Sequence, residues 1–290
     1  MRVISRPAVG GIEVFEADLK SSKIFPVPLG PWAHAAPSTR DALVYATEGT
    51  VIRIDPGGSE RWRLDLDMED PDPAAMIDVA FSADDSRVWV YAPNPAAEHD
   101  EWIVLDAATG AILSRRPLEA VGQGGHQFPL RDGRMMLDVG EGQDGSLIFL
   151  AGPDGEPRNF GWSDRVLIDV SPDERQFMTI DHEGQADVAL HAFPGGEVLV
   201  RLTVSDFGED PEIGVIEWTG GYLDAETVIV VVHGEDEEAG GPWWRHYRVN
   251  TGTGEVLDDL GIVTIDEYDL QPLGDGTFVV TDTDGTLRRM

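Results

Sequence analysis

Histidine and aspartate side chains recur at one position of a repeated pattern, which is how separate segments of a chain can build one site. The pattern is an acidic turn between two short strands, and its markers are Arg40, Asp84, Asp132, Asp173, Asp224 and Asp275. Six residues before the markers stand His34, Asp78, His126, Leu167, Trp218 and Asp269. Imidazole and carboxylate groups bind divalent metals and act as general acids and bases. A candidate metal or acid–base site therefore consists of His34, Asp78, His126 and Asp269.

The same four residues also fit an interpretation without any ligand. Channels lined by the first strands of repeated sheets are wet and carry polar side chains, and an aspartate before a strand often caps a loop. A shift of one residue in register would also turn such a side chain to the opposite face of its strand. The sequence leaves both interpretations open.

The spacing of the turns identifies the elements that must position these residues. Successive markers are 44, 48, 41, 51 and 51 residues apart, and the step from Asp275 through the C-terminus to Arg40 would be 55. Periods of about 40–50 residues with four short strands each are typical of propeller blades. The segments 76–82, 87–93, 101–107 and 111–118 predict the four strands of one such blade.

We therefore predict an all-β chain in which residues 1–290 form a single β-propeller domain of four-stranded antiparallel blades. Six blades are favoured and seven are possible, because spare strand material remains at both ends. Residues 11–30 read as a two-stranded hairpin, and residues 268–290 read as two or three strands without a fourth. Joining the two ends in one blade would close the ring and remove exposed strand edges.

Three short segments carry a resemblance to a known family. "FSADD" at 81–85 and "VSPDE" at 170–174 each precede a strand, and "VLDAATGAIL" spans 104–113. These segments resemble the WD40-like and YVTN-like β-propeller repeats of bacteria, and the likeness extends over nearly the whole chain. The GH and WD dipeptides of true WD40 blades are not in register. Because this family includes scaffolds, sensors, lectins and enzymes, the resemblance implies the fold and assigns no residue a role.

The positions of the long loops predict which face of the propeller carries the binding surface. Connections at one end of the strands are short turns, whereas those at the other end are long and acidic, namely 65–75, 92–101, 205–214 and 233–245. Long loops on a rigid scaffold are the usual place for binding residues. We expect the functional surface on this acidic end, which we call the top face.

One of these loops combines acidic and aromatic residues. Glu235, Asp236, Glu237 and Glu238 precede a Gly-Gly-Pro segment and then Trp243 and Trp244. A mobile lid of this kind could hold an amine or a basic peptide through carboxylates and cation–π contacts, with Trp218 adding a second aromatic surface. Alternatively, the acids form a solvated loop and the tryptophans pack between blades, which is the better description of Trp244.

Composition limits the classes of partner. The 290 residues include 54 acidic and 21 basic ones, a formal net charge of -33. Such a surface repels nucleic acids and anionic membranes. The same charge can also serve only to keep the protein soluble.

There is no cysteine, which excludes disulfides and thiol nucleophiles. The absence of an apolar run near the N-terminus favours a cytoplasmic protein. No serine-hydrolase, zincin, Walker or dinucleotide-binding motif is found in the expected context.

The leading functional hypothesis is a non-enzymatic propeller whose acidic top face recognises a basic protein, peptide or amine. Its expected binding residues are Trp218, Trp243, Glu235, Asp236, Glu237 and Glu238. The alternative is a metal-dependent lyase or hydrolase, in which His34, Asp78, His126 and Asp269 hold a divalent ion at the top of the channel. No other cofactor is implied. A third possibility is a structural hub that uses the outer strands of the blades.

Overall fold

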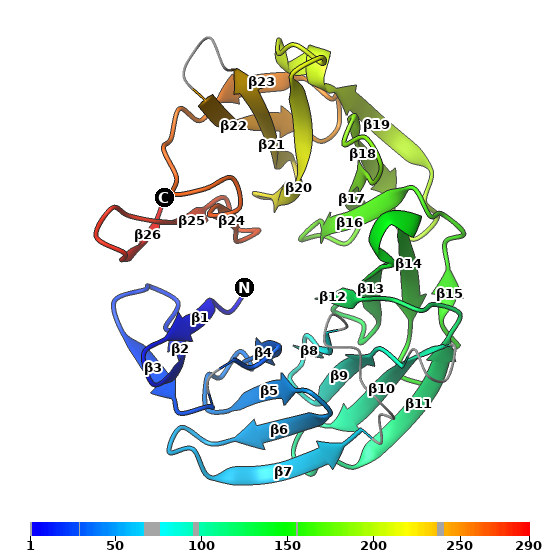
Figure 1. The fold of residues 1–290 in the computed structure, drawn as a ribbon, viewed down its shortest axis with the longest axis vertical. Coiled ribbons are helices and arrows are strands. Elements are labelled where there is room, and N and C mark those ends of the chain that lie inside the picture. The colour runs from blue at the N-terminus through cyan, green and yellow to red at the C-terminus, as the bar shows by residue number, and fades with distance from the viewer. Residues whose placement is uncertain (1, 29, 67–75, 95–98, 155, 237–240) are drawn as a thin grey trace. The chain divides into compact units, whose positions relative to one another are not determined.

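The strands of the described residues form seven antiparallel sheets (Figure 1). A computed structural model describes residues 2–28, 30–66, 76–94, 99–154, 156–236 and 241–290. Contacts between residues divide the described chain into two units, Arg2–Ser163 and Asp164–Met290. The first unit contains four sheets and the second contains three, and each unit is described by itself below.

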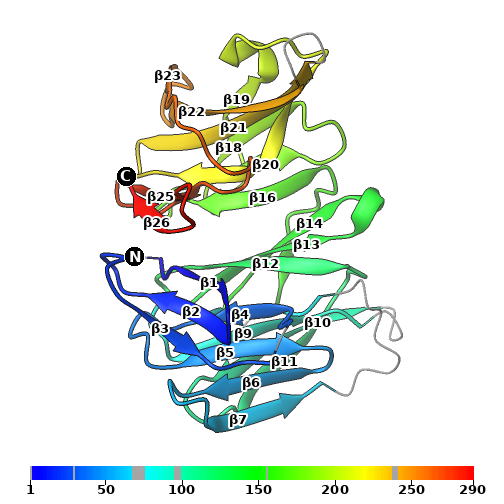
Figure 2. The same ribbon diagram turned by 60° about the vertical axis from the view of Figure 1, so that its left-hand side comes forward.

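The four sheets of Arg2–Ser163 follow one another along the chain, and strands consecutive in sequence are neighbours in each sheet. Figure 2 shows β4–β7 as successive neighbours in their sheet. The strands are β1 (Ser5–Ala8), β2 (Gly11–Phe15) and β3 (Ser22–Phe25); β4 (Ala33–Ala35), β5 (Leu43–Thr47), β6 (Thr50–Ile54) and β7 (Glu60–Asp65); β8 (Asp78–Phe81), β9 (Arg87–Ala92), β10 (Asp100–Asp106) and β11 (Ile112–Leu118); and β12 (Gly124–Pro129), β13 (Met135–Gly140), β14 (Ser146–Ala151) and β15 (Arg158–Asn159).

The three sheets of Asp164–Met290 repeat the same up-and-down order. Their strands are β16 (Arg165–Val170), β17 (Gln176–Asp181), β18 (Asp187–Ala192) and β19 (Val198–Thr203); β20 (Gly214–Tyr222), β21 (Thr227–Asp236), β22 (Gly241–Asn250) and β23 (Val256–Asp259); and β24 (Gln271–Pro272), β25 (Phe278–Thr281) and β26 (Leu287–Arg289). Among the described residues, two short 3-10 helices lie in connections, one in each unit, namely η2 (Gly142–Asp144) and η3 (Val204–Phe207). No helix in the described part of the chain is long and apolar enough to span a membrane.

The ends of the chain decide between the six blades that the prediction favoured and the seven that it allowed. The prediction joined the N-terminal hairpin to the C-terminal strands in one blade. Instead β1, β2 and β3 pair among themselves, and β24, β25 and β26 form a separate three-stranded sheet. The prediction missed β1 because a turn of only two residues, Val9 and Gly10, joins it to β2, and Gly10 has a φ of 92° that favours glycine. Seven sheets therefore replace the favoured six.

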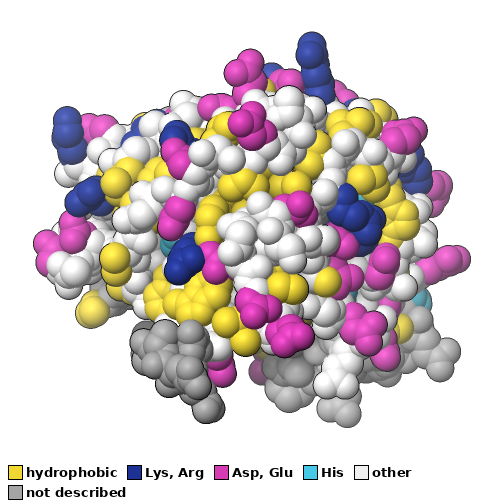
Figure 3. Space-filling model, turned by 90° about the horizontal axis from the view of Figure 1, so that it is seen from above, with side chains coloured by type: hydrophobic (Ala, Val, Ile, Leu, Met, Phe, Trp, Pro, Cys, Tyr) yellow, Lys and Arg dark blue, Asp and Glu magenta, His cyan; other side chains and the backbone are white. Residues whose placement is uncertain are grey.

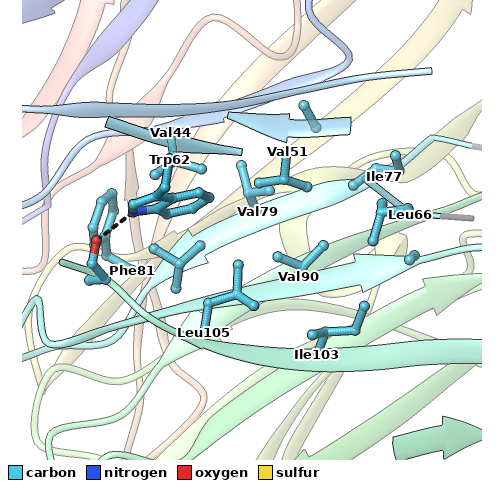
Figure 4. Close-up of a cluster of buried hydrophobic side chains, with 14 residues drawn as sticks. Val44, Val51, Trp62, Leu66, Ile77, Val79, Phe81, Val90, Ile103 and Leu105 are labelled. Atoms are coloured by element: carbon cyan, nitrogen blue, oxygen red, sulfur yellow. Dashed lines mark hydrogen bonds between the residues drawn. The ribbon is translucent and has the colours of Figure 1, made fainter. Parts of the chain in front are cut away.

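The second strand of a typical sheet is buried on both faces. In β9, Val88 and Val90 pack into the hydrophobic cluster shared with β4–β7, whereas Trp89 and Tyr91 pack into the cluster shared with β12–β15. Side chains alternate between the faces of a strand, so β9 supplies both layers. Figure 4 shows the first of these clusters, in which Val90 lies among residues from both sheets. The same principle holds in β21, where Val228, Val230 and Val232 enter one cluster and Ile229 enters another.

The acidic turns have one structure throughout the chain. In each of the five that carry an aspartate marker, the carboxylate accepts a hydrogen bond from the backbone N–H two residues later. The donors for Asp84, Asp132, Asp173, Asp224 and Asp275 are the N–H groups of Ser86, Arg134, Arg175, Glu226 and Thr277. This Asx-turn explains why aspartate recurs at the marker. The five aspartate markers are therefore structurally equivalent.

Candidate functional site

Three of the predicted site residues lie on first strands of the unit Arg2–Ser163. His34 on β4 is half-buried, its Nε2 lies 3.1 Å from Ser5 Oγ, and burial lowers its pKa. Asp78 begins β8, and its Oδ2 accepts a 3.0 Å hydrogen bond from Gln127. Burial raises the pKa of Asp78, and the nearby His126 partly opposes this rise. His126 itself is exposed on β12 and packs edge-on against Phe128.

The fourth predicted ligand is engaged in a loop. Both carboxylate oxygens of Asp269 accept hydrogen bonds from the backbone N–H of Thr281, at 3.1 and 3.0 Å. Within the described ranges, the one group of three imidazole or carboxylate donors that lie within 4.8 Å of one another is Glu217, His233 and Glu267. None of the four predicted ligands belongs to that group, so their assignment as a metal site stays a prediction.

Glu217 owes its position to an irregularity in β20. Ile216 pairs with Val232 and Gly220 pairs with Val230, so three residues of β20 lie opposite one residue of β21. Bulges of this kind redirect side chains and are frequent beside functional sites. The result is a buried Glu217, which is 6% exposed, followed directly by Trp218, which is 40% exposed.

Three side chains hold the Glu217 carboxylate. Oε1 lies 2.9 Å from His233 Nδ1, and Oε2 accepts hydrogen bonds from the Tyr268 hydroxyl at 2.8 Å and the Gln185 amide at 3.3 Å. Partial burial and the neighbouring carboxylate raise the pKa of Tyr268, so its hydroxyl keeps its proton and remains a donor. We call Gln185, Glu217, His233, Glu267 and Tyr268 the Glu217 cluster.

Negative charge dominates the Glu217 cluster. Its two glutamates face one histidine, and among the described residues the only ion-pair partner of Glu217 is His233, which carries charge only when protonated. A buried carboxylate ordinarily requires a cationic or strongly hydrogen-bonding partner. The cluster can therefore attract a cation, either a metal ion or a charged group of a ligand.

Trp218, the residue after Glu217, presents a partly exposed aromatic side chain. Its indole N–H donates to the carbonyl oxygen of Asp181 at 3.1 Å, and its ring stacks on His182 with 5.5 Å between centroids. Tyr268 is 53% exposed. Two partly exposed aromatic side chains therefore lie next to or within the Glu217 cluster.

The segment predicted as a mobile lid is instead mostly strand. β21 continues through Glu235 to Asp236, β22 begins at Gly241, and the two strands pair with each other. Glu235 is exposed and pairs with Pro242. Glu237 and Glu238 lie outside the described residues. The long hairpin corrects the prediction of a thirteen-residue loop at 233–245, and strand-forming valines in β21 explain it.

Both tryptophans of this hairpin have partners. The Trp243 ring packs on Gly234, where an added Cβ would lie 2.5 Å from the ring, and the Arg245 guanidinium lies over the same ring at 5.0 Å from its centroid. Trp244 on the opposite face donates its indole N–H to Thr264 Oγ1 at 2.8 Å. The packing predicted for Trp244 fits this arrangement, and Trp243 already carries a cation from its own chain.

A second acidic recess lies in the unit Arg2–Ser163. Its lining includes His99 and the acids Glu119, Glu141 and Glu156, and its apolar lining includes Phe149 and Leu118. Glu141 accepts a hydrogen bond from the Val121 N–H, and Glu156 forms an ion pair with Arg116 at 3.4 Å. Acidic side chains are also spread over the side of the molecule seen in Figure 3, where Lys and Arg side chains interrupt them.

The outer strands bear the apolar side chains that a structural hub would use. Val198 and Leu199 of β19 are 47% and 52% exposed. Both belong to one short strand, so the patch is modest.

The fold places the chain in the class of β-propellers, with seven blades. The solved structures that it resembles include the Dos1 propeller (TM-score 0.62, 13% identity, covering 99% of this chain and 76% of that one). The WD40 β-propeller domain of Doa1 is similar (TM-score 0.60, 12% identity, 99% and 88%), as is hydrazine synthase of Kuenenia stuttgartiensis (TM-score 0.59, 13% identity, 90% and 76%).

These likenesses confirm the predicted fold-level resemblance to WD40 and other propellers, and they extend to the fold alone. No protein-family model matches the chain, and no curated protein matches it.

The sequence alone did not single out Glu217, His233, Glu267, Gln185 or Tyr268. Counting six residues back from Asp224 reached Trp218, one position from Glu217. The extra residues in β20 could not be read from the spacing, because a bulge leaves the period of the repeat almost unchanged. The acidic residues Asp266 and Glu267, next to Tyr268, were the available signal.

Proposed function

We propose that this chain is a non-enzymatic binding propeller whose acidic face recognises a cationic group of a basic protein, peptide or amine. The proposed binding residues are Trp218, Trp243 and the acids Glu235, Asp236, Glu237 and Glu238. The proposal treats residues 1–290 as one propeller domain of the cytoplasm, and it includes no binding of nucleic acid or membrane.

One observation carries the proposal, namely the 40% exposed side chain of Trp218, which directly follows the buried Glu217 in the sequence. A cation over the face of an aromatic ring is attracted by the ring quadrupole, and a desolvated carboxylate strengthens that attraction. The Arg245 guanidinium over Trp243 is an intramolecular example of the same contact on the neighbouring hairpin. Trp218 has no such cation among the described cation–π pairs, so its exposed surface is the better candidate for a ligand.

The charge of the chain supports the same ligand class. A formal net charge of -33 accelerates the encounter with a cationic partner. Salt screens this attraction and therefore weakens it. General attraction of this kind is not specific, however. Specific recognition requires that single side chains on the proposed surface matter more than equal charges elsewhere.

The test is a calorimetric titration of the full chain with a synthetic Lys- and Arg-rich peptide, in the presence of a chelator. Trp218→Ala and Glu235→Gln should each weaken binding several-fold, and binding should weaken between low and high ionic strength. Glu226→Gln removes the same charge at the opposite end of β21, and Leu257→Ala truncates an exposed side chain on β23. These two controls should bind as the unaltered chain does.

Equal affinity for all four variants would contradict the proposal, because general electrostatic attraction alone would then explain binding. Affinity that does not change with salt would contradict its electrostatic part.

The alternative function is a metal-dependent lyase or hydrolase at His34, Asp78, His126 and Asp269. The observation that favours it is the pair Asp78 and His126, since burial raises the pKa of Asp78 beside an exposed imidazole. A raised carboxyl pKa next to a histidine suits acid–base chemistry. Loss of all stabilisation by divalent ions in His126→Ala, with the ions still effective in His182→Ala, would support this alternative.

A further inference from the structure

We propose that Glu217, His233 and Glu267 form a binding site for a first-row divalent transition metal, with Zn²⁺ the ion that best fits their donor atoms. This site is separate from the four ligands predicted from the sequence. It also does not depend on the cationic partner proposed above, because it concerns an inorganic ion held by three side chains.

The geometry of the donors is the first argument. One donor atom from each residue lies within 4.8 Å of the other two. Ligands about 2.0–2.2 Å from one Zn²⁺ lie about 3.3–3.6 Å apart in tetrahedral geometry. One pair of donors, His233 Nδ1 and Glu217 Oε1, is 2.9 Å apart. A small movement of the half-buried Glu267 side chain would complete the set.

The chemistry of the donors is the second argument. One imidazole and two carboxylates match the ligands of zinc and related ions, with one position left for water or a ligand group. Calcium is a poorer fit, because it takes six to eight oxygen ligands and does not use imidazole. The donor set therefore selects a transition metal over a hard cation.

Burial is the third argument, and it sets this group apart from surface acids. Glu217 is only 6% exposed, yet among the described residues it has no Lys or Arg partner. Leaving a buried carboxylate with a histidine as its sole ion-pair partner, beside a second glutamate, is costly. A divalent cation would supply the missing positive charge.

The surrounding contacts provide the support that metal ligands usually have. Tyr268 and Gln185 both donate to Glu217 Oε2, which fixes the carboxylate and leaves Oε1 toward His233. Tyr268 also ties its own loop, and therefore the adjacent Glu267, to the sheet. Such outer contacts orient metal ligands and raise affinity.

The experiment measures Zn²⁺ binding to the full chain after chelator treatment, by calorimetry and by competition with a chromophoric chelator. Binding should saturate at one ion per chain. Glu267→Gln and His233→Ala should each weaken binding by at least about ten-fold, and Tyr268→Phe should weaken it less, because it removes only an outer contact. His182→Ala removes a nearby histidine outside the site and should bind normally.

A spectroscopic measurement makes the result independent of folding defects. Co²⁺ in the same site should give visible d–d bands of low-coordinate geometry, and Glu267→Gln should change them while its circular dichroism stays unaltered. Weak binding of several ions, unchanged in both Glu267→Gln and His233→Ala, would mean an adventitious ion only and would overturn the proposal. Peptide binding measured in chelator is unaffected by that outcome, so the two proposals fail separately.

Discussion

The indole N–H of Trp62 donates to the carbonyl oxygen of Ala107 over 2.8 Å (Figure 4). Trp62 lies on β7, the outermost strand of its sheet, and Ala107 follows β10 of the next sheet. Arg53 donates to the same oxygen. This bond joins neighbouring sheets at their periphery, where the hydrophobic cluster between them ends. It provides a direct test of how much polar contacts add to the packing of the blades.

Trp62→Phe should lower the free energy of unfolding by about 1–2 kcal/mol, because it removes this hydrogen bond and part of a buried ring. Urea unfolding followed by circular dichroism measures the change. The matched control is Trp218→Phe, whose indole is 40% exposed and donates to a carbonyl at 3.1 Å. If both substitutions shift the urea midpoint equally, burial of the Trp62 contact contributes nothing.

His246 should make the stability of the chain depend on pH. It is fully buried on β22, neither ring nitrogen has a hydrogen-bond partner, and burial lowers its pKa although Asp259 and Asp269 partly oppose this. Because the unfolded chain then binds protons more readily, the folded state loses stability as pH falls below about 7. His246→Leu should reduce the loss of stability between pH 7.5 and 5.5.

The measurement compares urea midpoints of the two proteins at both pH values. Contributions from His34 and His191, whose pKa values burial also lowers, cancel in the difference between the proteins. So do those of Asp78 and Asp100, whose raised pKa values act in the opposite direction. An identical pH dependence in both proteins would show that His246 is not the titrating group.

Asp84 should stabilise its turn more strongly when it is ionised. Hydrogen bonds from Ser82 and Ser86 lower its pKa to about 2. The folded pKa lies below the ordinary value, so this contribution is present above about pH 4 and is lost as pH falls through 2. The difference in unfolding free energy between the unaltered chain and Asp84→Ala should therefore shrink from pH 6 to pH 3. A constant difference would contradict the assignment.

Gly11→Ala tests the N-terminal sheet. A Cβ at Gly11 would lie 1.9 Å from the carbonyl oxygen of Phe25, and the φ of Gly11 is 156°. The substitution should destabilise β1–β3 by several kcal/mol, which native-state hydrogen exchange would detect as lost protection in these strands. Gly124→Ala has open space at its Cβ and is the control. Unchanged protection in Gly11→Ala would contradict the separate three-stranded sheet.

Much of the fold could be predicted, because the turn that sets the repeat is a local structure. Asp84 and its equivalents bind the backbone two residues ahead, a contact that depends only on residue type and neighbouring sequence. The ends were harder, since Val9–Gly10 makes a turn too short to share that signature. Pairing at the ends depends on contacts between distant residues, which local patterns do not encode.

The candidate site was predicted only in part. The repeat register selected Trp218, whereas Glu217 is buried through a bulge that the register cannot reveal. Residues from three segments, around Gln185, Glu217 and Glu267, meet through the packing of neighbouring sheets. The contacts between these segments arise from tertiary structure, and the spacing of residues in the sequence does not predict them.

The Asx-turns have a consequence for how the acidity of this protein could be adjusted. Each turn aspartate contributes through an oxygen that accepts a backbone N–H, and asparagine carries an equivalent oxygen. Replacing Asp84, Asp132, Asp173, Asp224 and Asp275 with asparagine would remove five negative charges while keeping the acceptors in place. The net charge of this scaffold can therefore change by substitution at these positions while the backbone structure of the turns is kept.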